Sequence, residues 1–102
     1  MIVDEFEIQG HECVEFPLSS RRVRLFVSSV HPVNLYVVDS ANLRHYKSRE
    51  PFVHHGPGAV RFYSQILHLP DGKWHALLEN PLDAALRVQA KVEPVEGEAK
   101  AG

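Results

Sequence analysis

The chain has little cysteine: Cys13 is the only one among 102 residues. No disulfide can therefore form within the chain, which excludes the disulfide-rich class of small secreted domains. No apolar run approaches the roughly 20 residues that a membrane-spanning helix needs. Residues 1–7 are acidic and alternating rather than basic and then apolar, so we expect no signal peptide. These absences together predict a cytoplasmic protein without membrane insertion.

The sequence also lacks an excess of positive charge and the spacings that carry common chemistry. Its formal net charge is −2, which offers no basic surface for a phosphate backbone, so we expect no nucleic-acid partner. It contains no His-x-His, Cys-x-x-Cys, His-Glu-x-x-His or Gly-x-Ser-x-Gly spacing, and these motifs are typical of zinc sites and serine hydrolases. We therefore expect a protein that is not an enzyme and that has no cofactor.

The composition itself is that of an ordinary globular protein. Hydrophobic residues make up 44% and charged residues 24% of the chain, and the length suits one domain. We expect this domain over residues 1–93. Residues 94–102 shift to Glu, Gly, Ala and Lys, so they are expected to form a flexible tail.

Hydrophobic and polar residues alternate along most of the chain, which is the period of a half-buried β-strand. The clearest example is the segment 22–29, where Val23, Leu25 and Val27 share one face. Convincing helical periodicity is missing. We expect strands over residues 1–8, 11–16, 22–29, 33–38, 59–69, 73–79 and 84–92. The pattern predicts an all-β fold, an antiparallel β-sandwich of seven or eight strands such as a jelly roll.

Residues 59–79 are expected to form a hairpin around the Pro-Asp-Gly sequence at 70–72. A three-residue loop with proline first and glycine last is typical of a tight turn between antiparallel strands. This loop pairs Leu69 with Lys73, and it is the register that gathers the apolar side chains on one face. That face is expected to contain Val60, Phe62, Ile66, Trp74, Ala76 and Leu78.

Residues 43–58 form the least regular and most basic stretch, and long loops in compact domains are often functional. Its cationic and aromatic side chains include Arg44, Tyr46, Lys47, Arg49 and Phe52. Arginine near aromatic residues is typical of protein interfaces. We expect these five residues to bind a partner, and the alternative is an ordinary solvated loop.

Two other features have structural interpretations. Arg21, Arg22 and Arg24 could line an edge strand and deter its pairing with other chains. Cys13 lies within a strand pattern and is interpreted as a small buried hydrophobic residue, because a reactive thiol needs an activating environment.

Histidine is unusually frequent, with seven residues in the chain. His54 and His55 are the alternative site, for a metal ion or another small ligand. Adjacent side chains on extended backbone point to opposite faces, so the two could share a metal only if the chain turns sharply at Gly56. Ordinary loop histidines are the other interpretation. Protonation of all seven would move the formal charge from −2 to +5, so a pH-responsive assembly is a third hypothesis.

The run 72–80, Gly-Lys-Trp-His-Ala-Leu-Leu-Glu-Asn, resembles the glycine–aromatic strand of GOLD domains. Those are β-sandwich modules of membrane traffic that bind cargo and other proteins. Cys13 lies where such domains carry an early cysteine, but Leu77 occupies the position of the second, so the disulfide of luminal members cannot form. The resemblance therefore implies a GOLD-like sandwich related to cytoplasmic members.

Residues 33–46, Val-Asn-Leu-Tyr-Val-Val-Asp-Ser-Ala-Asn-Leu-Arg-His-Tyr, are similar to a bacterial β-rich domain of unknown function found with TIR signalling domains. Residues 72–75 are again similar. Both resemblances imply a binding module and neither implies catalysis. We therefore expect a non-enzymatic interaction or assembly module that binds a protein partner or itself. A small-ligand or metal-binding domain that uses the loop histidines is the alternative.

Overall fold

The computed structural model describes residues 5–18 and 20–95, and most of these lie in strands. The elements in chain order are β1 (Glu5–Ile8), β2 (Cys13–Leu18), β3 (Arg22–Asp39), α1 (Ser40–Lys47), β4 (His55–His68), β5 (Trp74–Glu79) and β6 (Leu86–Pro94). Every strand pair is antiparallel, and the all-β class is confirmed. Within the described segments, no helix has the length and apolar character needed to cross a membrane.

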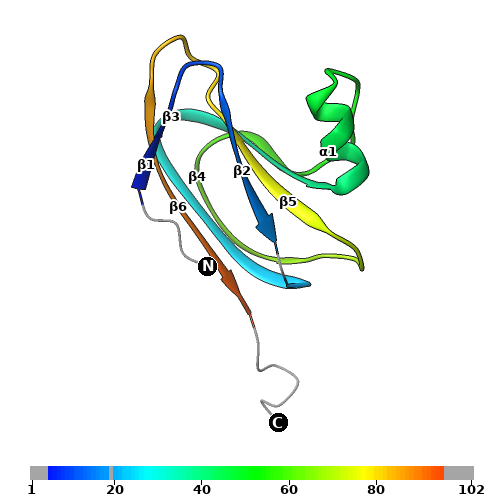
Figure 1. Cartoon of the computed structure of the whole chain (residues 1–102). Coiled ribbons are helices and arrows are strands. Elements are labelled where there is room, and N and C mark those ends of the chain that lie inside the picture. The colour runs from blue at the N-terminus through cyan, green and yellow to red at the C-terminus, as the bar shows by residue number, and fades with distance from the viewer. Residues whose placement is uncertain (1–4, 19, 96–102) are drawn as a thin grey trace.

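The six strands form one curled sheet (Figure 1). Its order is β1-β6-β3-β5-β2, and β4 lies along β3. β3 is the central strand, because its first half pairs with β6, its second half pairs with β5, and both halves pair with β4. The helix α1 lies outside the curl (Figure 1).

The connection between β4 and β5 shows how strongly β3 curls. His68 at the end of β4 pairs with Arg22, at the start of β3, whereas Trp74 at the start of β5 pairs with Asp39, at the end of β3. The chain from His68 to Trp74 can span at most about 20 Å. A straight strand as long as β3 would extend about 60 Å. The two ends of β3 are therefore brought together by bending.

The bend coincides with an irregularity in the strand pairing. The register of β3 against β4 shifts between Ser28 and Val33, and Pro32 lies in this interval. Proline has no N–H to donate to a ladder and is tolerated where pairing is irregular. The shift lets one long strand serve both halves of the curled sheet.

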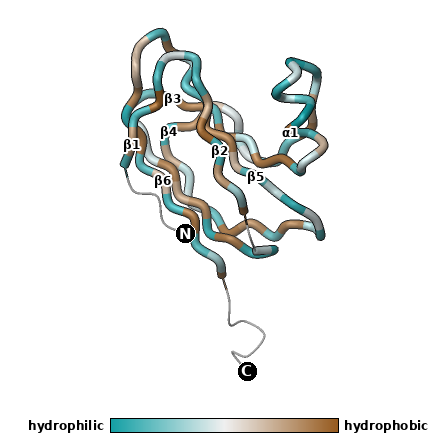
Figure 2. The backbone as a smooth tube through the Cα atoms, viewed as in Figure 1, coloured by the Kyte–Doolittle hydropathy of each residue, from teal (hydrophilic) through white to brown (hydrophobic). Residues whose placement is uncertain are grey.

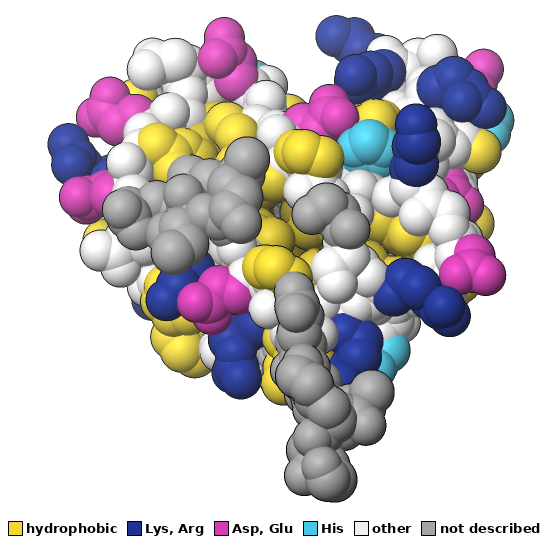
Figure 3. Space-filling model, turned by 60° about the horizontal axis from the view of Figure 1, so that its bottom comes forward, with side chains coloured by type: hydrophobic (Ala, Val, Ile, Leu, Met, Phe, Trp, Pro, Cys, Tyr) yellow, Lys and Arg dark blue, Asp and Glu magenta, His cyan; other side chains and the backbone are white. Residues whose placement is uncertain are grey.

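The inner side of the curl holds the main hydrophobic core. Val23, Leu25 and Val27 of β3 are at most 1% exposed, as their alternation predicts. The corresponding residues of the second half of β3 and of β6 are buried as well: Val33, Leu35, Val37, Leu86, Val88, Ala90 and Val92. From the bottom of Figure 1, hydrophobic side chains are seen in the middle and charged ones mostly around the periphery (Figure 3).

A second, smaller cluster lies on the opposite face, under α1. Val38 and Leu77 alternate with core residues along their strands, and they pack with Leu43 of the helix. Leu43 is the buried residue of α1, whose surface is otherwise mostly hydrophilic (Figure 2). The helix is therefore attached to the sheet by one side, and its polar side faces solvent.

The prediction of an irregular stretch over residues 43–58 is wrong for its first part, because the chain forms α1 there. The Asp-Ser-Ala-Asn sequence at 39–42 suggested a turn, but Asp39 acts as the N-cap of the helix instead. Its side chain accepts a hydrogen bond of 2.8 Å from the backbone N–H of Asn42. Short acidic side chains favour turns and helix N-caps for the same reason, so the local sequence does not separate the two.

The expected hairpin over residues 59–79 is also wrong. Within the described sheet β4 pairs with β3, and β5 pairs with β2 and β3. The apolar face assigned to β4 is partly reversed: Phe62 is 64% exposed, whereas Tyr63 and Leu67 pack against the core. Which side chains of β4 face the core depends on the strand that β4 pairs with, and that strand is β3 rather than β5.

The strand count and two further assignments differ as well. The described residues contain six strands rather than seven or eight, because 22–29 and 33–38 are parts of one strand, β3. Arg22 and Arg24 therefore lie on the central strand and not on an edge.

The boundaries at the two ends differ in detail. Pro94 ends β6, and the N–H of Val95 donates to the carbonyl of Arg22 at 2.9 Å. These two residues therefore belong to the sheet and not to the expected tail. The rest of that tail, 96–102, and residues 1–4 of the expected first strand lie outside the described residues.

The Asp39 cap leads to a pH prediction. Hydrogen bonds from Asn42, chiefly from its backbone N–H, lower the pKa of Asp39. A lowered pKa means that the folded state binds this proton more weakly than the unfolded chain does. The stabilisation is thus present above about pH 4, the usual Asp pKa, and is lost as the pH falls through the folded value.

We expect Asp39→Ala to lower the free energy of unfolding by about 1 kcal/mol at pH 7. The difference from the wild type should shrink at pH 3, where the carboxyl group is protonated. Urea unfolding at both pH values measures it. Asp39→Asn is the control, because an amide can still cap the helix but does not titrate in this range. A wild-type-to-alanine difference of equal size at pH 7 and pH 3 would contradict the role assigned to the carboxylate.

Candidate functional site

The last turn of α1 presents cations at the surface of the molecule. The N–H of Arg49 bonds to the carbonyl of Tyr46 at 3.1 Å, and that of Glu50 bonds to the carbonyl of His45 at 2.8 Å. This is the Schellman arrangement of a helix end, in which the residue after the cap adopts a left-handed conformation. Arg49 occupies that position with φ of 61°, where glycine is the usual residue. In Figure 3, Lys and Arg side chains gather on the side of the molecule that carries α1.

An aromatic cluster lies beside this turn. The rings of Tyr36 and Phe52 are 5.3 Å apart, and those of Tyr46 and Phe52 are also 5.3 Å apart, both edge to face. The His54 ring lies 4.7 Å from that of Tyr36. Edge-to-face contacts of this length stabilise the arrangement of rings. The cluster is therefore a preformed surface that joins β3 to the chain after α1.

A carboxylate is held next to the rings. Tyr46 donates a hydrogen bond of 3.1 Å from its hydroxyl to Glu79 Oε2, and the amide of Asn34 donates one of 3.0 Å to Oε1. Burial raises the pKa of Tyr46, and contacts with Cys13 and Glu79 raise it further. The hydroxyl group therefore stays protonated and donates at neutral pH. Burial likewise raises the pKa of Cys13, although the residue is only partly buried and not the buried residue expected from sequence.

These groups surround one concave region, which we call the α1 hollow. Its volume is about 490 Å³, and it is lined by His11, Tyr36, Tyr46, Lys47, Arg49, Glu50, Phe52 and Glu79. The structure therefore brings together four of the residues predicted to bind a partner: Tyr46, Lys47, Arg49 and Phe52. Arg44 is exposed on α1 but does not line the hollow.

The carboxylates at the hollow have partners within the protein, whereas one of its cations has none among the described residues. Glu50 pairs with His45 Nδ1 at 2.7 Å, and Glu79 accepts the two hydrogen bonds described above. Lys47 lies 3.4 Å from Glu15. Arg49 forms no ion pair in the described part of the chain. The carboxylates thus have partners within the protein, and a guanidinium group is left available.

Two residues of the hollow also have strained backbones. His11 and Arg49 have φ of 63° and 61°, and they are the two residues other than glycine with positive φ among those described. A left-handed conformation of such residues costs roughly 1–2 kcal/mol. They come from separate segments of the chain, yet both line the α1 hollow. Strain of this kind tends to gather at functional sites.

A polar group attaches the other end of α1 to the sheet. Ser40 Oγ lies 3.3 Å from His75 Nε2, and His75 Nδ1 lies 3.2 Å from Glu15 Oε2. The order Ser–His–Glu is that of a catalytic relay, but Nδ1 forms no aligned hydrogen bond with the carboxylate. We interpret the contact as a link between the helix and β5.

The alternative pair of histidines does not converge. The His54 ring packs on the aromatic cluster, whereas the His55 ring lies 5.3 Å from that of Trp74. The residues that the structure describes include no group of three or more His, Cys, Asp or Glu side chains placed to hold a metal ion.

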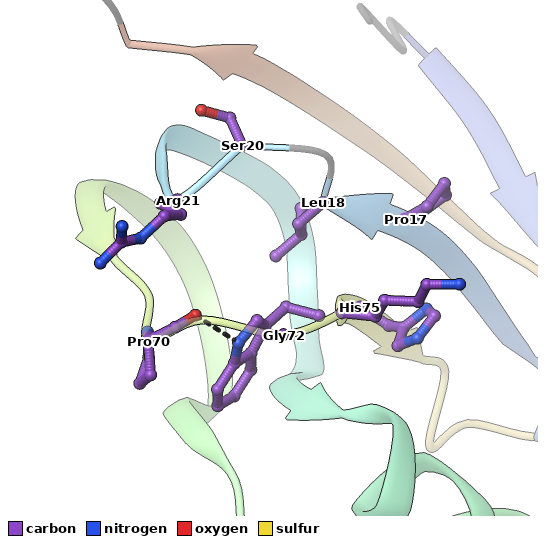
Figure 4. Close-up of a pocket in the computed structure, with 9 residues that line it drawn as sticks. Pro17, Leu18, Ser20, Arg21, Pro70, Gly72 and His75 are labelled. Atoms are coloured by element: carbon purple, nitrogen blue, oxygen red, sulfur yellow. Dashed lines mark hydrogen bonds between the residues drawn. The ribbon is translucent and has the colours of Figure 1, made fainter.

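A second concave region, the Trp74 hollow, lies between β2 and the β4–β5 connection (Figure 4). It has a volume of about 290 Å³ and is lined by Pro17, Leu18, Ser20, Arg21, Pro70, Gly72, Lys73, Trp74 and His75. Trp74 Nε1 donates to the carbonyl of Pro70 at 3.0 Å, so the indole N–H already has a hydrogen-bond partner within the protein. Trp74 also packs against the main core, as expected from sequence.

Sequence reasoning missed four residues of the α1 hollow: His11, Tyr36, Glu50 and Glu79. Tyr36 had a usable signal, because it is an aromatic residue on the outward face of a strand whose other face is apolar. His11 and Glu79 had none, because only the folded sheet brings the turn before β2 and the end of β5 to α1.

The comparisons with known proteins do not assign a family. No protein-family model matches the chain, and no curated protein matches its sequence. The geometry of the described residues is therefore the basis for any statement about function.

Proposed function

We propose that this protein is a non-enzymatic interaction module that binds an acidic segment of a protein partner at the α1 hollow. The observation that supports it most is the convergence of His11 and Arg49, the strained residues, on one concave region. Maintaining two unfavourable backbone conformations at a single place is more easily explained by binding than by stability.

The chemistry of the hollow indicates the kind of partner. Arg49 is unpaired within the described chain, and a guanidinium group binds carboxylates through two parallel hydrogen bonds. Lys47 can exchange its exposed contact with Glu15 for a partner's carboxylate at little cost, because exposed ion pairs contribute about 0–1 kcal/mol. The aromatic cluster offers a preformed contact for an apolar or aromatic side chain next to the acid. Val53, 75% exposed, extends the apolar surface.

The scaffold is part of the proposal. We propose that the curled sheet is a variant of the GOLD-like or jelly-roll β-sandwich, in which the β1–β6 and β2–β5 pairs act as two facing layers. Contact between the rings of Phe6 and Phe16, 5.8 Å apart across the core, supports this view. A cytoplasmic location suits the proposal because the single cysteine of the chain is free.

Selection from a random peptide library displayed on phage, followed by affinity measurements, tests the function. We expect the selected peptides to carry carboxylates next to an apolar or aromatic residue. The triple variant Arg44→Glu, Lys47→Glu, Arg49→Glu should bind them at least about tenfold more weakly, since one charge-assisted hydrogen bond contributes roughly 1.5–3 kcal/mol.

The matched control reverses three cations elsewhere: Arg21→Glu, Arg24→Glu, Lys73→Glu. It changes the net charge equally and alters the rim of the Trp74 hollow, so affinity should stay within about twofold of the wild type at 0.15 M salt, where charges about 8 Å apart or more are screened. Equal loss in both variants, or loss in the control alone, would overturn the proposal, as would peptides without any acidic preference.

Arg49→Gly separates binding from stability. Glycine adopts the left-handed conformation without penalty, so we expect the free energy of unfolding to rise by about 1 kcal/mol. The same change removes the guanidinium group, so affinity for the selected acidic peptides should fall. Urea unfolding and peptide titration on one sample measure both effects. A variant that is more stable and binds equally well would remove Arg49 from the site.

A further inference from the structure

β4 has an unpaired edge that is unusually open to another strand. Within the described sheet, one edge of β4 pairs with β3 and the other has no strand partner. Natural edge strands are short, or they carry charges, proline or bulges that prevent pairing. The segment 59–68 of β4 has ten residues with no proline, no glycine, no acidic residue and one formal cation, Arg61.

The other two edge strands are protected. β1 has four residues and carries Glu5 and Glu7, both near Arg87 of the neighbouring strand. β2 has six residues and contains Pro17. β4 contains Pro57 as well, but this proline lies near the start of the strand, and the ten residues after Gly58 contain neither proline nor an acidic residue.

The outer face of β4 carries exposed apolar surface. Phe62 is 64% exposed and touches the rest of the protein through an edge-to-face contact of 5.6 Å with Phe26. Ile66 lies on the same face four residues later, opposite Arg24 of β3, and is only partly buried. An exposed aromatic ring beside an unpaired backbone edge is typical of a strand-addition site.

We infer that β4 pairs antiparallel with β4 of a second copy of this chain, with the two Ser64 residues facing each other on the two-fold axis. The pleat limits the possible registers, because outward residues must lie opposite outward residues if the two sheets are to continue into one another. Of the registers that satisfy this, the one centred on Ser64 places Phe62 of each copy opposite Ile66 of the other. The exposed ring of Phe62 and the partly buried side chain of Ile66 are then covered by the same contact.

This register also fits the charges of the edge. Arg61 lies opposite Leu67, so no cation faces a cation between residues 61 and 67. Val60 packs against the core, beyond the irregularity in the pairing of β4, and lies outside the matched segment. Like charges directly opposite each other destabilise a strand pair. The edge is thus complementary to itself, and this self-complementarity argues for a second copy rather than an unrelated strand.

The inference is independent of the proposed function, because residues 59–68 contribute nothing to the lining of the α1 hollow. Sedimentation equilibrium of the full chain over a range of concentrations tests it. We expect a reversible dimer in the wild type. Phe62→Lys and Ile66→Glu should each weaken dimerisation at least tenfold, with circular dichroism and the unfolding midpoint showing that the variants remain folded.

Mixing the two variants is the decisive measurement. In the predicted register the introduced lysine of one chain lies opposite the introduced glutamate of the other, so the mixture should form a heterodimer more tightly than either variant forms a homodimer. Ala85→Lys adds a cation at an exposed residue between β5 and β6, outside both this edge and the α1 hollow, and should leave the dimer unchanged. A monomer at all concentrations, a dimer that both variants retain, or a mixture without recovery would each overturn the inference.

Discussion

Asn80→Ala is expected to lower the free energy of unfolding by roughly 3 kcal/mol, although residue 80 lies in a turn. Asn80 is 0% exposed. Its amide donates to the carbonyls of Ile8, Gln9 and Ala84 at 2.9, 3.2 and 2.8 Å, and its side-chain oxygen accepts from the N–H of Leu82 at 2.9 Å. Alanine removes all four hydrogen bonds. The carbonyl of Gln9 keeps its bond from the N–H of Glu12 at 3.0 Å, but the other three backbone groups lose the partner that Asn80 provides, and each unsatisfied buried group costs about 1 kcal/mol or more.

Two controls separate this effect from a general loss of a side chain. Asn34→Ala removes one half-buried hydrogen bond, to Glu79, and should cost about 1 kcal/mol or less. Asn80→Asp keeps the shape but turns a carboxylate toward three carbonyl oxygens, so it should be at least as destabilising as alanine at pH 7. Urea unfolding measures all three. If Asn80→Ala costs no more than Asn34→Ala, the buried amide does not hold the turns together.

Gly10→Ala is the second large effect. A Cβ at this position would lie 2.2 Å from the carbonyl oxygen of Asp83 and 2.6 Å from its carbonyl carbon. Both atoms belong to the backbone of the turn between β5 and β6, which lies beside the turn between β1 and β2 at the top of Figure 1. One turn must move, so we expect a loss of about 2–3 kcal/mol and a fall in Tm of roughly 10 °C or more.

Gly58→Ala is the matched control for that substitution. Gly58 has φ of 78°, but a Cβ there would meet nothing within 4 Å. It therefore reports backbone strain without a collision, at about 1 kcal/mol. Thermal unfolding of the two variants compares them directly. Gly10 is not among the glycines with positive φ, so a shift no larger than that of Gly58→Ala would contradict the predicted collision with Asp83.

The parts of the fold that sequence predicts correctly are those fixed by local alternation. The inward residues of β3 and β6 follow the two-residue period, and burial confirms them. Alternation does not state which strand pairs with which, and for β4 the predicted partner, residues 73–79, was wrong. The Pro-Asp-Gly sequence at 70–72 looks like a hairpin turn, yet it connects two strands that pair with opposite ends of β3.

The same distinction applies to the candidate site. The cations and aromatics of α1 and the following loop are close in sequence, so Tyr46, Lys47, Arg49 and Phe52 could be grouped without a structure. The strained conformation of Arg49 could not, because a left-handed arginine at a helix end contradicts the residue's own preference. It accompanies the Schellman hydrogen bonds at the end of α1, and the sequence has no glycine or asparagine there to mark that end.

The central place of β3 determines when the chain can fold during its synthesis. β1 is made first but pairs with β6, whose residues 86–94 are made last among the described strands. Until β5 is made, β3 and β4 are the described strands that can pair, and the apolar inner side of this ribbon is uncovered. All of residues 5–94 must therefore have left the ribosome before the sheet closes, and chaperones that shield apolar strands have their longest opportunity to act on this ribbon.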